Sequence, residues 1–192
     1  MMTDGANDHP TGLRTVIAED YRAHDRDWTR PGFRTLAVYR FGVWRMGLRS
    51  SLIRKMASLI YRSAFRYCRN IYGIELPYSA RVGRGVVIEH QGAIVVHGNT
   101  VIGDGTIIRQ GCTLGIRHLD RLDEAPVIGR NVNIGAGAVI LGNVSIGDNA
   151  SIGANSVVLA DVPEGCLAVG VPARIIEQVG KSDPGRSVSR TS

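Results

Sequence analysis

The sequence predicts a mainly β protein: a parallel β-helix built from six-residue repeats, preceded by an α-helical segment. The main observation is a run of aliphatic residues at a strict spacing of six, at Ile128, Ile134, Ile140, Ile146, Ile152 and Val158. Gly follows most of these positions, and a small or apolar residue stands two positions before each of the later ones. A period of six fits neither a helix face nor a long strand, but it fits a coil of three short strands joined by three tight corners.

The length and the cysteines set broad bounds. A chain of 192 residues allows one or two domains. Cys68, Cys112 and Cys166 are odd in number and lack a short metal-type spacing, which argues against a disulfide framework and a zinc site. The polar N-terminus resembles no secretory signal, and no apolar run approaches the length of a membrane span. We therefore expect a cytoplasmic protein without a metal.

Residues 1–72 form the expected helical N-terminal segment. Residues 1–10 are polar and are expected to be disordered. Pro31 is suited to the first turn of a helix, and Gly47 breaks the helical pattern. Apolar residues at helical spacing predict three helices, over Leu13–His24, Phe33–Met46 and Ser51–Ile71.

The positive charge of the chain belongs to this segment. Residues 1–72 contain 13 Arg and Lys against 6 Asp and Glu, whereas the rest of the chain is close to neutral. Between residues 40 and 69 the basic residues alternate with aromatic and aliphatic ones, which is typical of nucleic-acid or anionic membrane surfaces. The alternative is a helical cap that packs its apolar face on itself or on another subunit. We expect the cap and no nucleic-acid partner, with peripheral membrane contact as an open alternative.

The six-residue pattern begins at Gly73 and predicts a β-helix domain over residues 73–176. Its phase shifts by two residues around residues 95–98, and the inward positions pause between Leu114 and Ile128. The polar stretch at residues 115–127 is therefore expected to be a loop thrown out from one corner, and such loops often carry function. Residues 177–192 are expected to form a flexible tail.

One repeat carries polar residues where Gly is expected. Glu89 and His90 follow Ile88, and Glu75 lies almost one coil earlier, so Glu75 and His90 are candidates for neighbours on adjacent rungs. A carboxylate beside an imidazole fixes its tautomer and raises its basicity, as a general base requires. The alternative is that His90 and His97 are corner residues on a solvated surface.

Three stretches within residues 75–176 resemble the bacterial serine O-acetyltransferase family: IEHQGAIVVHGNTVIGDGTIIRQGCTLG, IGRNVNIGAGAVILGNVSIGDNASIGANSVV and AVGVPARII. The resemblance implies a left-handed coil, although parallel strands are usually joined by right-handed crossovers. It also implies a homotrimer, or a dimer of trimers, with active sites between subunits and acetyl-CoA as the acetyl donor.

The same resemblance assigns roles to individual residues. His90 matches the catalytic His of the family, and Glu75 matches the Asp that orients it. The positions expected to bind CoA are Gly115, Ala136 and Ala154. The positions expected to bind the acceptor are Glu89, Arg117 and His118. His90 would take the proton of the acceptor hydroxyl and return it to the departing thiolate, so no cysteine nucleophile is needed.

Two departures from the family bear on the acceptor and on the partners. Where the family carries Gly-Asp-Arg-His-Pro, whose Arg and His hold the serine carboxylate, this chain has LDEAP at residues 122–126, and Glu124 would repel a carboxylate. Exopolysaccharide O-acetyltransferases, which the repeats also resemble, lack the same pair. We therefore expect a hydroxyl acceptor such as a saccharide, with L-serine as the alternative. The C-terminus lacks the Ile that binds O-acetylserine sulfhydrylase, so that complex is not expected.

A different class of function remains open. Some proteins with this repeat are scaffolds, and others bind a metal through three His at a subunit interface, as carbonic anhydrases do. His90, His97 and His118 could supply three such ligands. Metal analysis distinguishes this reading, and a pure scaffold would lose nothing on His90→Ala.

Overall fold

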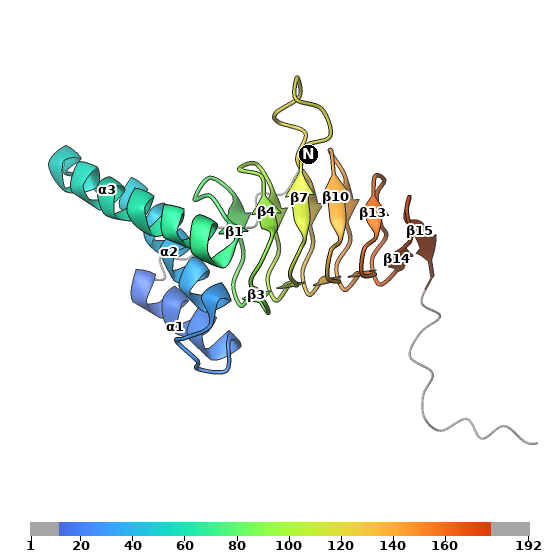
Figure 1. Ribbon diagram of the computed structural model, residues 1–192, viewed down its shortest axis with the longest axis horizontal. Helices are drawn as coiled ribbons and strands as arrows, with labels where there is room; N and C mark the ends of the chain where they lie inside the picture. Colours follow the sequence, from blue (N-terminus) through green and yellow to red (C-terminus); the bar gives the residue numbers. More distant parts are fainter. Residues whose placement is uncertain (1–11, 178–192) are drawn as a thin grey trace, which may run out of the picture.

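In a computed structural model, which describes residues 12–177, a β-helix is closed at one end by a helical cap (Figure 1). The predictions for residues 1–10, and for the tail after residue 177, lie outside the described part. The cap contains α1 (Leu13–Ala23), α2 (Pro31–Met46) and α3 (Ser51–Tyr67), followed by the short π-helix η1 (Cys68–Tyr72). These bounds confirm the three helices expected from the sequence, and Pro31 opens the second. Within the described residues, none of the helices has the length and apolar character needed to cross a bilayer.

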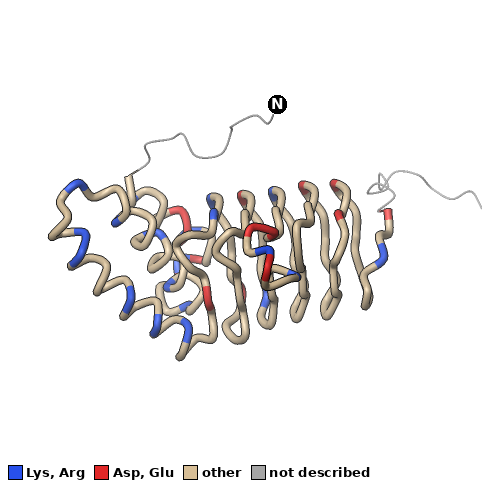
Figure 2. The backbone as a smooth tube through the Cα atoms, turned by 90° about the horizontal axis from the view of Figure 1, so that it is seen from above, with Lys and Arg blue, Asp and Glu red and all other residues tan. Residues whose placement is uncertain are grey.

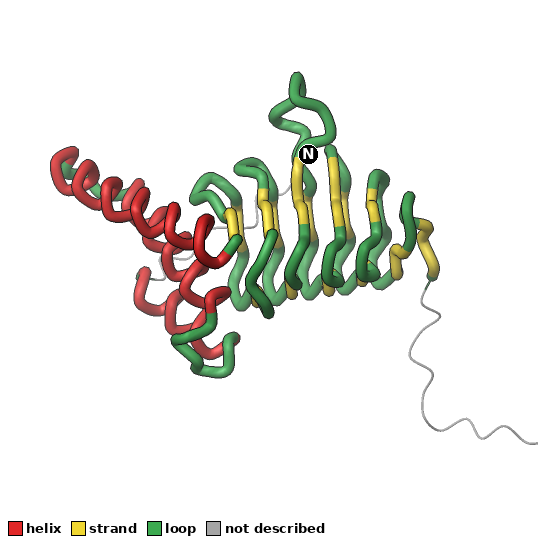
Figure 3. Tube along the Cα trace, in the orientation of Figure 1, coloured by secondary structure: helices red, strands yellow, loops and turns green. Residues whose placement is uncertain are grey.

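The β-helix consists of short strands joined by tight corners, as the six-residue period predicts (Figure 3). They form three sheets, parallel except at the C-terminal end. Sheet A contains β1 (Ile74–Glu75), β4 (Ile94–Val96), β7 (Thr113–Gly115), β10 (Val139–Leu141) and β13 (Val157–Val158). Sheet B contains β2 (Arg81–Val82), β5 (Val101–Ile102), β8 (Val127–Ile128) and β11 (Ser145–Ile146). Sheet C contains β3 (Val87–Ile88), β6 (Ile107–Ile108), β9 (Asn133–Ile134), β12 (Ser151–Ile152), β14 (Leu167–Val169) and β15 (Arg174–Ile176).

The core is the stack of inward aliphatic side chains that the period identifies. Ile128, Ile134, Ile140, Ile146, Ile152 and Val158 are all buried. The earlier inward positions, from Leu76 to Leu114, are buried as well. At the C-terminal end β15 turns back antiparallel to β14, so the last stretch leaves the parallel coil.

The phase shift between the repeats lies elsewhere than the sequence indicated. Ile88 pairs with Ile108 and Val96 pairs with Leu114, so the chain advances 8 residues between the two strands of the first coil and 6 in the next. Val95 pairs with Thr113, so the two additional residues lie between Ile88 and Val95, within residues 89–94, and not at residues 95–98. Pattern reading misplaced them because Ile94 and Val96 are both buried, so each fits an inward phase.

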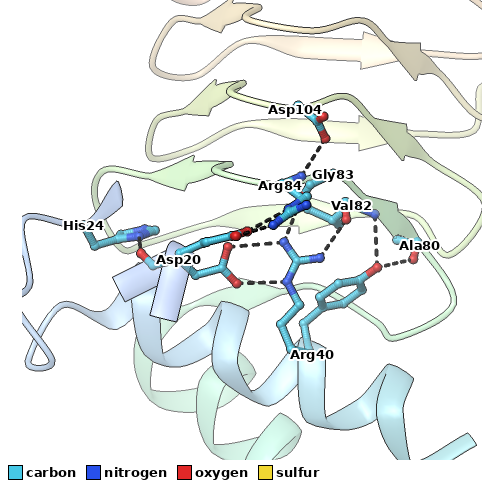
Figure 4. Close-up of polar contacts among 10 residues, drawn as sticks. Asp20, His24, Arg40, Ala80, Val82, Gly83, Arg84 and Asp104 are labelled. Atoms are coloured by element: carbon cyan, nitrogen blue, oxygen red, sulfur yellow. Dashed lines mark hydrogen bonds and ion pairs between the residues drawn. The ribbon is translucent and has the colours of Figure 1, made fainter. Parts of the chain in front are cut away.

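The helical cap satisfies the backbone of the first coil, which has no preceding rung (Figure 4). Arg40 donates to the carbonyl oxygens of Val82 and Gly83, at 2.7 and 2.5 Å, and forms an ion pair with the buried Asp20 at 2.9 Å. Tyr39 Oη donates to the Ala80 carbonyl at 2.8 Å. The same oxygen accepts from the Val82 N–H at 3.0 Å. Buried polar backbone groups need such partners, so these side chains join the cap to the coil.

Candidate active site

His90 lies exposed in the corner between β3 and β4. Between the paired positions Ile88 and Val95 the chain has two residues more than between Ile108 and Thr113 on the next rung. Gly92 and Ala93, within this longer connection, both adopt positive φ, at 106° and 51°. Backbone hydrogen bonds hold it on both sides: the Gly92 N–H donates to Tyr72 at 2.9 Å, and the Gly92 carbonyl accepts from Gly111 at 2.8 Å. The corner thus presents the imidazole to solvent on a defined backbone.

Glu89 is engaged with a neighbour on the next rung. Its carboxylate lies 2.7 Å from Arg109 Nε, and both side chains are about one-third exposed. Arg109 also donates to Asn133 Oδ1. Our sequence reading missed Arg109, although the signal was present: Arg109 follows Ile108 as Glu89 follows Ile88, at the position that Gly takes in most later repeats.

Glu75 lies on the rung beside His90, but the two side chains are not bonded in the single chain. Glu75 in β1 is paired with Val95 in β4, the strand into which the His90 corner leads. Among the hydrogen bonds and ion pairs of residues 12–177, none joins Glu75 to His90. The orienting role of Glu75 therefore remains a prediction.

Ala136 and Ala154 lie at corners between sheets C and A, along the same edge of the coil as His90. The Asn155 N–H donates to the Ala136 carbonyl at 2.8 Å, and the Gly137 N–H donates to Gln110 at 2.8 Å, so successive corners are bonded in a line. Ala154 is exposed and Ala136 is half-buried. This edge offers small side chains and backbone groups, a surface that suits an elongated ligand.

Gly115, Arg117 and His118 lie at a different edge, where the chain passes from sheet A to sheet B. The loop at 115–127 rises there above β7 and β10 (Figure 1). Its base is fixed where the Gly142 N–H donates to the Gly115 carbonyl at 2.9 Å. Arg117 and His118 are exposed. The structure therefore separates the predicted residues into two groups, and one chain does not bring them together.

A small pocket lies between this loop and the β-helix. Its volume is about 210 Å³, and its lining includes Arg117, His118, Arg121 and Glu124. Arg121 pairs with Glu124 at 3.2 Å, and the charged residues of the loop are seen from above in Figure 2. The sequence did not indicate where the side chains of Arg117, His118 and Arg121 point. In the structure all three line this pocket.

The positions of the cysteines and histidines bear on two kinds of chemistry, catalysis by a cysteine nucleophile and binding of a metal ion. Cys68, Cys112 and Cys166 are buried, and burial raises the pKa of the Cys68 and Cys112 thiols, which disfavours the reactive thiolate. Within the described single chain, no group of three His, Cys, Asp or Glu side chains is arranged to hold a metal ion. His90 and His97 lie at opposite ends of β4, and His118 lies in the loop.

Comparison with known proteins identifies the same architecture. Residues 125–160 match the family model described as bacterial transferase hexapeptide (six repeats). The serine acetyltransferase of Brucella abortus, solved in complex with coenzyme A, is similar in structure with a TM-score of 0.72 and 32% identity, over 84% of this chain and 66% of that one.

Two curated relatives are similar over most of this chain. The serine acetyltransferase of Synechococcus elongatus is 38% identical over 155 residues, which cover 80% of this chain and 61% of the relative. The chain thus spans less than two-thirds of that protein. The serine acetyltransferase of Helicobacter pylori is 37% identical over 168 residues, which cover 85% of this chain and 94% of the relative. The chain belongs to the serine acetyltransferase family.

Proposed function

We propose that the chain is an acetyl-CoA-dependent O-acetyltransferase in which His90 acts as the general base. The observation that carries the proposal is the His90 corner: an exposed imidazole on a lengthened turn, at the same edge as the small residues Ala136 and Ala154. The related enzyme of Brucella abortus binds coenzyme A. An elongated cofactor along this edge would bring its thioester toward His90.

The chemistry needs one proton carrier. His90 takes the proton from the acceptor hydroxyl, and the oxygen attacks the thioester carbonyl of acetyl-CoA. The carbon–sulfur bond then breaks, and His90 returns the proton to the CoA thiolate. Glu75 would orient the imidazole. The buried cysteines support direct transfer, because none offers an exposed thiolate for a covalent intermediate.

We further propose that the active site is completed by a neighbouring subunit in a homotrimer of left-handed β-helices, with a dimer of trimers as the larger alternative. His90 and the loop at 115–127 lie at different edges of one chain. Packing the sheet C to sheet A edge of one subunit against the sheet A to sheet B edge of the next would bring Arg117 and His118 to His90. Cyclic symmetry then forms the same contact three times.

Two acceptors have specific support. Arg117, His118 and Arg121 line one pocket, and cations suit the carboxylate of L-serine. Glu124 also lines it and would repel a carboxylate, although its pairing with Arg121 offsets part of its charge. A neutral saccharide hydroxyl is the second candidate, because it meets no such repulsion.

The test is release of CoA thiol by the purified chain, with L-serine or a panel of monosaccharides as the acceptor. Turnover with L-serine that falls on Arg117→Ala through a raised KM identifies serine and the loop pocket. Turnover with saccharides alone identifies the second candidate. The absence of turnover with every hydroxyl acceptor, while CoA still binds, would contradict the transferase proposal.

A further inference from the structure

The helical cap presents an unusual concentration of positive charge. Residues 28–74 contain ten Arg and Lys and no Asp or Glu. Arg30 and Arg40 are paired with carboxylates of residues 20–27. Within the described residues, no ion pair to a carboxylate involves the six cations from Arg49 to Arg69. In Figure 2 basic residues recur along α3, the helix at the far end of the cap that Figure 1 labels.

Helix α3 also exposes a stripe of large apolar side chains. The α3 stripe consists of residues that are half to more than two-thirds exposed: Leu52, Ile53, Met56, Leu59, Ile60 and Tyr67. The helix packs inward through Ala57 and Tyr61 instead, so the stripe is not part of the core. At 100° per residue the stripe occupies one side of the helix, and Lys55, Arg62 and Arg66 form the adjoining side. This arrangement is the pattern of a helix that lies in a membrane interface.

A pocket on the basic side of α3 gathers cations around an apolar floor. Its volume is about 680 Å³, and Arg45, Arg54, Lys55 and Arg62 line it, with no carboxylate among the lining residues. Arg45 is 6% exposed, and its guanidinium lies 4.4 Å from the ring centres of both Tyr61 and Tyr78. Its Nη1 donates to Ser58 at 2.9 Å, whereas its Nε has no hydrogen-bond partner among residues 12–177. A phosphate group would match this excess of donors.

We propose that α3 binds the surface of an anionic phospholipid bilayer. The cations of α3 contact headgroup phosphates, the pocket at Arg45 receives one headgroup, and the α3 stripe enters the boundary of the acyl chains. This surface is separate from the His90 corner, so the proposal does not depend on the proposed acetyl transfer.

Two other partners fit this surface of α3 less well than an anionic bilayer does. Packing of α3 against α3 of a second copy would bring the unpaired cations of both together without an acidic residue between them. A nucleic acid would satisfy the cations but would leave the apolar stripe in water. An anionic bilayer satisfies both features at once.

The test is co-sedimentation of the full chain with vesicles of phosphatidylcholine alone, or of equal parts of phosphatidylcholine and phosphatidylglycerol. The chain should sediment with the mixed vesicles only, and added salt should weaken this binding. Arg62→Gln combined with Arg66→Gln should lower the affinity by about tenfold or more. The matched control is Arg81→Gln with Arg174→Gln, which also removes two positive charges, but outside the helical cap. This control should keep most of the affinity of the parent chain for the mixed vesicles.

A second pair of variants tests the apolar half of the surface. Ile53→Ser with Ile60→Ser should reduce vesicle binding without changing the oligomeric state, whereas Leu119→Ser with Leu122→Ser, in the loop, should bind as the parent chain does. Equal binding to both kinds of vesicle, or to neither, would overturn the proposal. Dissociation into smaller oligomers on Ile53→Ser with Ile60→Ser, without vesicle binding by the parent chain, would assign the stripe to a second copy instead.

Discussion

The imidazole of His24 is buried between α1 and β3. It contacts Ile88, the residue directly before the Glu89–His90 corner. Its Nδ1 lies 2.7 Å from the Asp20 carbonyl oxygen, and its Nε2 accepts from the Ile88 N–H at 3.2 Å. Only a neutral ring with the proton on Nδ1 satisfies both contacts. Burial lowers the pKa of His24, so the folded chain keeps this ring neutral.

This contact predicts a loss of stability in mild acid. The unfolded chain protonates His24 at about pH 6.5, whereas the folded chain resists protonation. The stabilisation is therefore present above that pH and is lost as the pH falls toward the lower pKa of the folded state. His24→Gln should therefore flatten the fall in the free energy of unfolding between about pH 7 and about pH 5, measured by urea denaturation. His118→Gln, an exposed control, should leave the slope unchanged. An equal slope for His24→Gln and the parent chain would refute the assignment.

At the scale of elements, the cap is attached to the coil by buried polar contacts rather than by apolar packing alone. The Asp20 side chain is fully buried and that of Arg40 is 10% exposed. Arg40 also binds two carbonyls of the first coil. Removing the Asp20 carboxylate would leave the buried Arg40 guanidinium without a negative charge to balance it.

Asp20→Asn is expected to lower the free energy of unfolding by about 3 kcal/mol, because it breaks a buried ion pair. Asp25→Asn breaks the exposed pair with Arg30 and should change it by less than about 1 kcal/mol. Denaturant unfolding of the parent chain and of both variants measures these two changes in the free energy of unfolding. Similar small effects from both would show that Arg40 gains little from Asp20.

The helices and strands of this chain could be predicted from its sequence, but the contacts between them could not. The strands follow from the period of six because each inward Ile is determined by its own repeat, and the helix bounds follow from local spacing and from Pro31. The contacts of His24 and Arg40 were not foreseen, because several Arg residues of the cap look alike in sequence and only tertiary packing decides which becomes buried. Arg109 could have been found, since it breaks the repeat in the way that Glu89 does.

For the whole molecule, the separation of His90 from the loop at 115–127 is the reason for proposing that neighbouring subunits complete the site. One chain carries both halves of the proposed site, but at different edges of the coil. The family resemblance implies a site between subunits, but the repeat pattern alone does not tell whether two candidate residues meet within one chain or, as proposed, across two copies.

Mixed assemblies test the shared site. His90→Ala chains and chains with Arg117→Ala and His118→Ala should each be weak alone. Refolded together at equal concentrations, they should recover about one quarter of the parent activity, because one quarter of the interfaces then combine an intact His90 with an intact loop. Thiol release measures the recovery, with each variant refolded alone as the control. Mixtures no more active than the two variants alone would place the whole site within one chain.

If His90 moves the proton during acetyl transfer, as proposed, then His90→Ala should slow the release of CoA thiol. The variant should lose at least about a hundredfold in kcat while still binding CoA, whereas His97→Ala should keep its activity. Acetyl transfer by His90→Ala at the parent rate would show that His90 is not the general base.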